Sequence, residues 1–417
     1  MNYEIKIFDE DGISLGKLND FSQFELSRTK NDVGTLNISL PAIHYNFEDF
    51  RNDYRVEVYR NNKLIGDTCW FLKRKELSLT SGESTLVLTF ADTIDILKRR
   101  VNAWFGCESP QCFGTIQATP ENLLRFLAKS NFGSLVGASG EVTTDLPPDF
   151  GSISAGVVPA VEYAYRQIYG AAETDVLEKH RAIPSLIIDG YSPINIATDL
   201  NVVQEISFVE VLSAMQDVAN TAFATPREDL QHNIWFDIIY SPATPITEAR
   251  FEFNAWAGVR GRDLRNTKFI GPNYGNLNNA VLTEDYTNKG DIAYVLTDGA
   301  ETTSVIGSAI LPVETNKYFY DLPFGPTEIV TDFGQENADA TVLEGEGLAT
   351  LGMLNKVRTL DGNIVNTKNF DFGTDYNYGD ILTMSWGDIL ESVEIAEITI
   401  SLDGNGVETI TVPLSIL

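Results

Sequence analysis

The chain has 417 residues with 30 basic and 59 acidic side chains, which gives a formal charge of −29. A hydrophobic content of 43% and a charged content of 21% exclude a disordered chain, and the length favours two to three domains. The negative charge disfavours attraction to duplex DNA or to an anionic membrane, because both repel it. The sequence has neither a run of about 18 apolar residues nor the pattern of a secretion signal at its start, so we expect no integral membrane segment.

The acidic excess is concentrated toward the C-terminus. Residues 1–100 carry a net charge of −2 and residues 101–270 carry −9, whereas residues 271–417 carry −18, from 5 basic and 23 acidic side chains. A solvated surface that keeps the protein soluble explains such a bias. The bias also fits a surface that faces something anionic and must not bind it.

The first hundred residues predict β-structure. Apolar and polar residues alternate over several short segments separated by turn residues, as expected for a barrel or a sandwich. These segments are 3–8, 36–41, 55–60, 69–72 and 85–90. A short helix is expected from Asp92, with basic residues at its C-terminal end.

The middle of the chain predicts two helices and a long loop. Pro120 stands at the first position of one expected helix, which Gly133 ends. Residues 134–160 are rich in Gly, Ser, Thr and Pro and predict a long loop. Ser207 and Glu210 have the spacing of a capping box. The apolar residues that follow recur at helical spacing and predict a buried face: Phe208, Val211, Leu212, Met215, Val218, Ala219 and Ala222.

The last part again predicts mainly strands. They are expected at 234–240, 251–253, 292–296, 327–330, 381–384, 393–395, 398–400 and 407–412, with a helix-compatible stretch at 337–354. The sequence Asp403-Gly404-Asn405-Gly406 predicts a hairpin turn. The fold class is therefore mainly β with some α, an α+β protein.

No pattern in the sequence supports catalysis. Gly12-Ile13-Ser14-Leu15-Gly16 fits the nucleophile-elbow pattern, but its flanks alternate like a hairpin and no helix follows. The stretch 345–350 lacks the third glycine of a dinucleotide loop. We therefore predict that the protein is not an enzyme.

The candidate metal ligands and cysteines also favour structural roles. Cys107 and Cys112 are either free thiols in a loop or a small disulfide-closed loop. Asp371, Asp375 and Asp380 lack the regular ligand spacing of a calcium loop, so a solvated turn is favoured. With three histidines in the chain and no ligand pattern, we expect no metal and no cofactor.

Several segments together resemble the tail hub proteins of long-tailed bacteriophages. The similarity lies in the order and spacing of segments at both ends of the chain, and it is weak over 101–195. In the first part it comprises 3–9, 24–28, 34–41, 55–60 with Gly66, 70–74 and 91–100. In the last part it comprises 278–281, 285–288, 345–354 and 378–382.

This resemblance implies a structural virion protein, assembled in the host cytoplasm and located at the distal end of the tail. The family forms a homotrimeric ring in which each chain contributes two tail-tube-like antiparallel β-barrels. The ring joins the distal tail protein ring to the tail tip and fibre proteins, and its lumen passes the tape measure protein and then the DNA. No specific nucleic-acid binding is implied.

Under this resemblance the domains are 1–100, an N-terminal hub barrel; 101–200, a peripheral region with a long loop; 201–270, a linking helix and strands; and 271–417, an acidic C-terminal hub barrel. The chain ends directly after its last expected strand, so we expect no further module. An acidic lumen would not retain DNA, and its candidate residues are Asp371, Asp375, Asp380, Asp388, Glu391, Glu394 and Glu397. The alternatives are a carbohydrate- or receptor-binding β protein of the tail tip and, less favoured, a glycan hydrolase.

Overall fold

The computed structural model describes most of the two ends of the chain and parts of its middle. The described residues are 2–79, 84–101, 114–132, 186–188, 202–206, 209–224, 233–287, 289–296, 307–310, 327–332 and 358–416, with 343, 347, 350, 351 and 354. Cys107, Cys112, Ser207 and all of 134–160 lie outside them. The predictions made for those positions therefore stay predictions.

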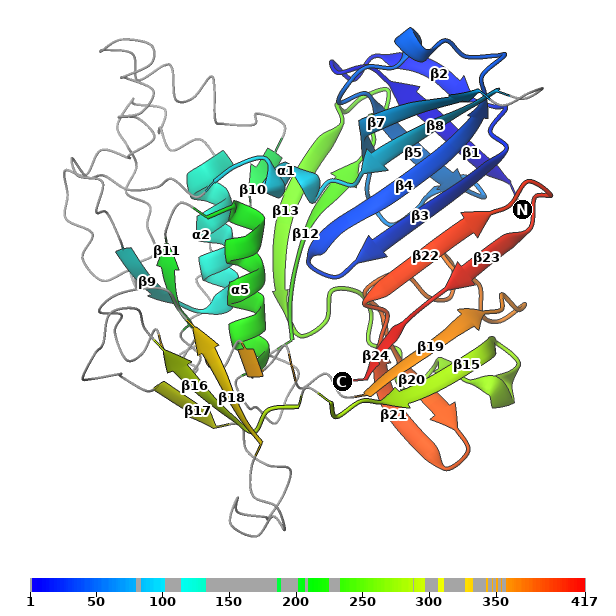
Figure 1. Cartoon of the computed structure of the whole chain (residues 1–417). Helices are drawn as coiled ribbons and strands as arrows, with labels where there is room; N and C mark the ends of the chain where they lie inside the picture. Colours follow the sequence, from blue (N-terminus) through cyan, green and yellow to red (C-terminus); the bar gives the residue numbers. More distant parts are fainter. Residues whose placement is uncertain are drawn as a thin grey trace, which may run out of the picture.

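The N-terminal β region is antiparallel, with the strand order β3-β4-β8-β7-β5-β1-β2 (Figure 1). Its strands are β1 (Tyr3–Phe8), β2 (Ser14–Leu18), β3 (Gln23–Thr29), β4 (Asp32–Pro41), β5 (Arg55–Arg60), β6 (Lys63–Leu64), β7 (Trp70–Leu79) and β8 (Ser84–Ala91). A short 3₁₀ helix, η1 (Phe47–Asp49), follows β4. The pattern of Gly12 and Gly16 lies in the β1–β2 hairpin, which confirms the predicted hairpin in place of a nucleophile elbow.

The C-terminal β region continues the same sheet. Its strands are β14 (Phe269–Ile270), β15 (Leu277–Glu284), β19 (Arg358–Ile364), β20 (Ile381–Trp386), β21 (Ile389–Glu394), β22 (Glu397–Leu402), β23 (Glu408–Thr411) and β24 (Leu414–Ile416), with a 3₁₀ helix η3 (Pro272–Tyr274). β22 pairs antiparallel with β3 and joins the two regions. Within the described residues the hydrogen-bonded order runs from β14 to β2 without closing on itself. The fold is rich in β-structure as expected, but the strands of the described residues form no closed barrel.

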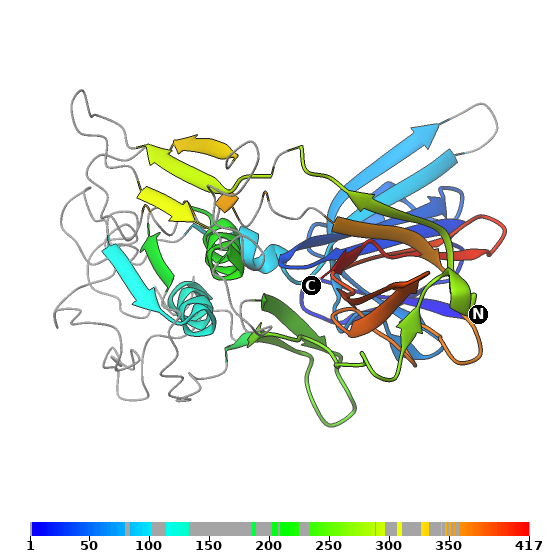
Figure 2. The same cartoon turned by 90° about the horizontal axis from the view of Figure 1, so that it is seen from below.

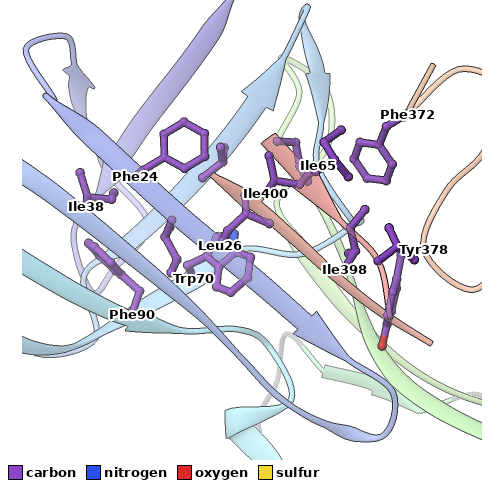
Figure 3. Close-up of a cluster of buried hydrophobic side chains, with 14 of the residues drawn as sticks. Phe24, Leu26, Ile38, Ile65, Trp70, Phe90, Phe372, Tyr378, Ile398 and Ile400 are labelled. Atoms are coloured by element: carbon purple, nitrogen blue, oxygen red, sulfur yellow. The ribbon is translucent and has the colours of Figure 1, made fainter. Parts of the chain in front are cut away.

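The shared core explains why two regions so far apart in sequence form one unit. Leu26 on β3 faces Ile400 on β22, and both side chains are completely buried. Figure 3 shows Trp70, Phe90 and Ile38 from the N-terminal region in the same cluster as Ile398 and Ile400. Each fully buried side chain of this size contributes about 1.5–3 kcal/mol of transfer free energy. Separating the two regions would return much of this surface to water.

A helical region lies beside the β regions (Figure 2). It contains α1 (Asp95–Lys98), α2 (Pro120–Phe132), α5 (Val211–Ala224) and a small sheet of β10 (Leu186–Ile188), β12 (Ile234–Ser241) and β13 (Arg250–Ala257). The remaining strands are β9 (Gly114–Ala118) paired with β11 (Val202–Ile206), and β16 (Ile292–Leu296) paired with β17 (Gly307–Ile310) and β18 (Glu328–Asp332). The predicted apolar stripe of α5 is buried, since Leu212, Met215 and Val218 are at most 2% exposed. Phe208 lies outside the described residues.

Candidate functional site: a buried charged junction

Three groups of largely buried charged side chains connect the regions of the fold to one another. We call them together the charged junction and define it by Arg28, Asp92, Asp237, Arg260, Arg60, Glu408, Asp371, Lys30 and Glu394. Charged residues are rarely buried unless they are paired. The charged junction is therefore the part of the fold in which charged side chains are buried in pairs.

Arg28 on β3 is the centre of the first group and is 1% exposed. Its Nε lies 3.2 Å from Oδ2 of Asp92, which follows β8, and its Nη2 lies 2.8 Å from Oδ1 of Asp237 on β12. Its Nη1 donates to the carbonyl of Gly66. The guanidinium carbon also lies 4.8 Å from the ring centroid of Tyr378, a cation–π distance. One side chain thus contacts the N-terminal region, the helical region and the C-terminal region.

Arg260 completes this first group from the other side of Asp237. Its Nη2 and Nε lie 2.6 and 2.9 Å from Oδ2 of Asp237, and its Nη1 donates to the carbonyl of Tyr378 at 3.1 Å. Two guanidinium groups and two carboxylates therefore alternate, and their formal charges cancel. This balance offsets part of the cost of removing four charges from water.

The two carboxyl groups of this group titrate differently because their surroundings differ. Burial raises the pKa of Asp92 to about 6, and the single cation Arg28 offsets this only in part. Burial acts on Asp237 in the same direction, but Arg28 and Arg260 together hold its pKa below the usual value. Of these two carboxyl groups, Asp92 is therefore the one that loses its charge first on acidification.

The second group connects β5 to the C-terminal region. Arg60 is 5% exposed, and its Nε and Nη2 lie 2.8 and 3.0 Å from the two carboxylate oxygens of Glu408. The same Nη2 lies 3.0 Å from Oδ1 of Asp371, and Nη1 donates to the carbonyl of Phe372 at 2.6 Å. The hydroxyl of Tyr3 donates to Glu408 at 2.5 Å. Burial, then the hydrogen bond to Glu408, raises the pKa of Tyr3 far above its usual value.

The third group surrounds Glu394, which is 1% exposed at the end of β21. One carboxylate oxygen accepts hydrogen bonds from the indole of Trp235 at 2.6 Å and from the amide of Asn233 at 2.7 Å. The other lies 3.1 Å from Nζ of Lys30. Charge-assisted bonds of this kind are about twice as strong as neutral ones, so Glu394 ties β12 to both β regions.

The seven acidic residues proposed for a lumen do not form one exposed surface. Asp380 and Glu394 are each 1% exposed, which corrects the expectation for these two, because a side chain buried within its own chain cannot form a channel wall. Asp375 pairs with Lys268 and Asp371 with Arg60, both partly buried. Asp388 is exposed in the β20–β21 turn, and Glu391 and Glu397 are half-buried on the strands β21 and β22.

Two of these acids, Asp375 and Asp380, pair with cations of one segment that sequence reasoning did not single out. Arg260, Arg262, Arg265 and Lys268 are four cations within nine residues of a strongly acidic chain. Three of them pair with Asp237, Asp380 and Asp375 from distant parts of the sequence. This local reversal of charge was a signal for paired acids that the sequence offered, although only Arg260 of the four cations belongs to the charged junction.

A groove and a free cysteine are two further features of the described residues. A groove of about 520 Å³ lies beside Glu408 and is lined largely by polar groups, among them Asn278, Asn279, Asn366 and Thr409. Cys69 is a buried free thiol. Within the described part of the chain no helix is long and apolar enough to cross a membrane. The same part holds no cluster of three or more His, Cys, Asp or Glu side chains arranged to bind a metal ion.

A β-rich chain whose charged side chains join its regions to one another fits a structural protein, and comparison with known families places it in the phage tail. It belongs to the family described as Siphovirus ReqiPepy6 Gp37-like protein, whose model matches residues 4–414. The predicted relation to phage tail proteins is confirmed. No curated protein sequence matches the chain.

Solved structures of phage tail proteins are similar to the chain at low sequence identity. The 43 kDa tail protein of prophage MuSo2 from Shewanella oneidensis aligns with a TM-score of 0.53 and 11% identity over 100% of both chains. The tail protein from Neisseria meningitidis MC58 aligns with a TM-score of 0.49 and 10% identity, over 99% of this chain and 96% of that one. The first of these likenesses shows a common fold.

Proposed function

We propose that this tail protein is the hub at the distal end of the tail, a homotrimeric ring that joins the distal tail protein ring to the tail tip. The charged junction is the observation that carries the proposal. The sheet continues through β3 and β22, and three buried groups fix the two β regions to each other. Three chains can present six equivalent positions to a hexameric neighbour only if the two regions of each chain keep one orientation.

In this proposal residues 1–100 and 271–417 are the two hub domains. Each would serve as a tail-tube-like unit, with closure into a barrel left to contacts formed in the assembled ring. Residues 101–200 would form a peripheral region, and residues 201–270 would link it to the hub. The buried helix α5 and the strands β12 and β13 support the linking role, because they carry both the apolar core of the helical region and Asp237.

The passage of the tape measure protein and of DNA through the ring is part of the same proposal. Among the expected lumen acids that are not fully buried, Asp371 and Asp375 pair with Arg60 and Lys268, so the proposal assigns the lumen to Asp388, Glu391 and Glu397. A wall of this sign would not pair with passing phosphates, whereas each lysine on it could neutralise one. The acids paired in the junction would contribute structure and not channel charge.

The mass of the purified protein in solution, alone and with the distal tail protein, tests the proposal. We expect a species of three times the 46.1 kDa chain mass, either alone or on addition of the distal tail ring. Obligate rings bury large interfaces and resist dilution. A chain that stays monomeric in the presence of the distal tail ring would contradict the hub assignment.

A second function, recognition of a host carbohydrate, is favoured by the groove beside Glu408. Its asparagine and threonine side chains offer donors and acceptors of the kind that bind hydroxyl groups. Calorimetry with host surface glycans tests this function. Binding that is lost in Asn278→Ala and kept in Leu390→Ala, a distant exposed position, would support it over the hub.

A further inference from the structure

One segment of the C-terminal region lies on the sheet with little of its own side-chain surface buried. Residues 261–271, which we call the strap, run from the end of β13 to η3 and include β14. The strap lies parallel to β20: Asp263 is opposite Ile381, Phe269 opposite Thr383 and Ile270 opposite Met384. It covers the edge of β20 that β21 does not pair with.

The strap is held by backbone hydrogen bonds and by ion pairs. The amide of Leu264 donates to the carbonyl of Ile381 at 2.8 Å, the amide of Ile381 to Arg262 at 3.0 Å, and the amide of Thr383 to Lys268 at 3.1 Å. Nη2 of Arg262 lies 2.7 Å from Asp380, and Nζ of Lys268 lies 2.7 Å from Asp375. In the first pair the Arg262 side chain is 47% exposed but that of Asp380 only 1%. In the second pair Lys268 and Asp375 are 25% and 22% exposed, so salt screens the second pair more strongly.

Its apolar attachment is slight compared with that of the strand it covers. Among the side chains of the strap only Ile270 is buried, whereas β20 buries Ile381, Leu382 and Met384 completely. Segments with few buried apolar contacts and exposed backbone hydrogen bonds open at low free energy, while core strands open only with the whole protein. Parallel pairing is also slightly less stable per residue than antiparallel pairing.

Two glycines show how closely the strap fits. A Cβ atom at Gly261 would lie 2.4 Å from Oδ1 of Asp380, and one at Gly271 would lie 2.0 Å from the carbonyl oxygen of Ser385. Both distances are far below van der Waals contact. A side chain at either position would lift that end of the strap from the sheet without changing any charge.

We propose that the strap is a detachable cover of β20, which separates from the sheet while β20 and β21 stay paired. Its attachment depends on ionic strength mainly through the pair of Lys268 and Asp375. In the detached state the edge of β20 offers unpaired backbone groups, which is the usual template for adding another strand. This inference does not rest on the hub assignment.

Native-state hydrogen exchange on the full chain tests the strap. We expect the amides of Ile381 and Thr383, which donate to the strap, to exchange through an opening that is easier than global unfolding, and faster as salt increases. The amides of β21 that pair with β20 are the internal reference. The strap proposal is wrong if both sets exchange with the same free energy and the same salt dependence.

Two variants distinguish the contribution of the ion pair from that of the close packing at Gly261. Asp375→Asn removes the partner of Lys268. It should speed hydrogen exchange at the Thr383 amide roughly fivefold, which is the effect of losing an ion pair worth about 1 kcal/mol. Exchange in this variant should also depend less on salt than exchange in the parent. Asp388→Asn, in the β20–β21 turn, is the matched control and should leave the exchange rate unchanged. Gly261→Ala should speed exchange at Ile381 while keeping the salt response. Parental exchange at Thr383 in Asp375→Asn would overturn the proposal even if Gly261→Ala does not fold.

Discussion

Replacing Arg28 by methionine should destabilise the protein strongly at neutral pH. Methionine keeps an unbranched apolar stem like that of arginine but leaves Asp92 without its cation and Asp237 with Arg260 alone. Removing one partner from a buried ion group costs about 3–5 kcal/mol. Equilibrium urea unfolding at pH 7.5 measures this directly. An Arg28→Met variant within about 1 kcal/mol of the parent would refute the idea that the junction fastens the regions.

The same experiment repeated against pH tests the assignment of Asp92. Because its pKa rises from 3.8 to about 6 on folding, the folded state takes up a proton more readily between these values. The contribution of Asp92 to the free energy of unfolding is therefore highest below about pH 4 and falls as pH rises to about 6, by about 3 kcal/mol for two pKa units.

The comparison that isolates this contribution is between the parent and Asp92→Asn. The stability of the parent relative to the variant should fall from pH 4 to pH 6 and stay level above. The Arg28→Met defect should also shrink at pH 5, because a protonated Asp92 no longer needs a cation. A parent–variant difference that is flat from pH 4 to pH 7 would show that Asp92 is ionised throughout.

Two further predictions concern the helical region and the acidic surface. Leu212→Ala in α5 should lower the free energy of unfolding by about 2–5 kcal/mol, because the Leu212 side chain is 2% exposed. The control Leu390→Ala, at a position that is 65% exposed, should melt like the parent. Equal melting temperatures of the two variants would contradict the burial of α5 in the core. Lysine at Asp388, Glu391 and Glu397 together should leave tails intact but slow genome ejection, with a defect that shrinks as salt rises. Parental ejection rates at every salt concentration would remove these acids from the lumen.

Local patterns predicted the elements whose packing follows from alternation alone. The segments 3–8 and 55–60 coincide with β1 and β5, and Pro120 begins α2 as expected. In each of these elements one face is apolar and the other polar, or a capping signal marks the end. Such information is contained within a few neighbouring residues.

The junction could not be predicted because its partners are far apart in sequence. Arg28 and Asp237 are separated by 209 residues, and Arg60 and Glu408 by 348. No local pattern shows which of 59 acids meets a given arginine. The strand β15 was missed for a different reason: most of its side chains are exposed, so it lacks the apolar alternation of a half-buried strand.

The acidic lumen shows where composition misleads. A net charge counts every carboxylate equally, but Asp380 and Glu394 serve as buried partners of Arg262 and Lys30. Their charge is cancelled inside the fold and contributes little to any surface field. The distinction between structural and surface acids required the positions of their partners.

Electron cryomicroscopy of the intact phage tail tests the hub assignment most directly. The account predicts three copies of this chain around the tail axis, with the N-terminal and C-terminal β regions alternating in six positions below the distal tail ring and with the helical regions outside. Copies located away from the axis, or a single copy on it, would contradict the account.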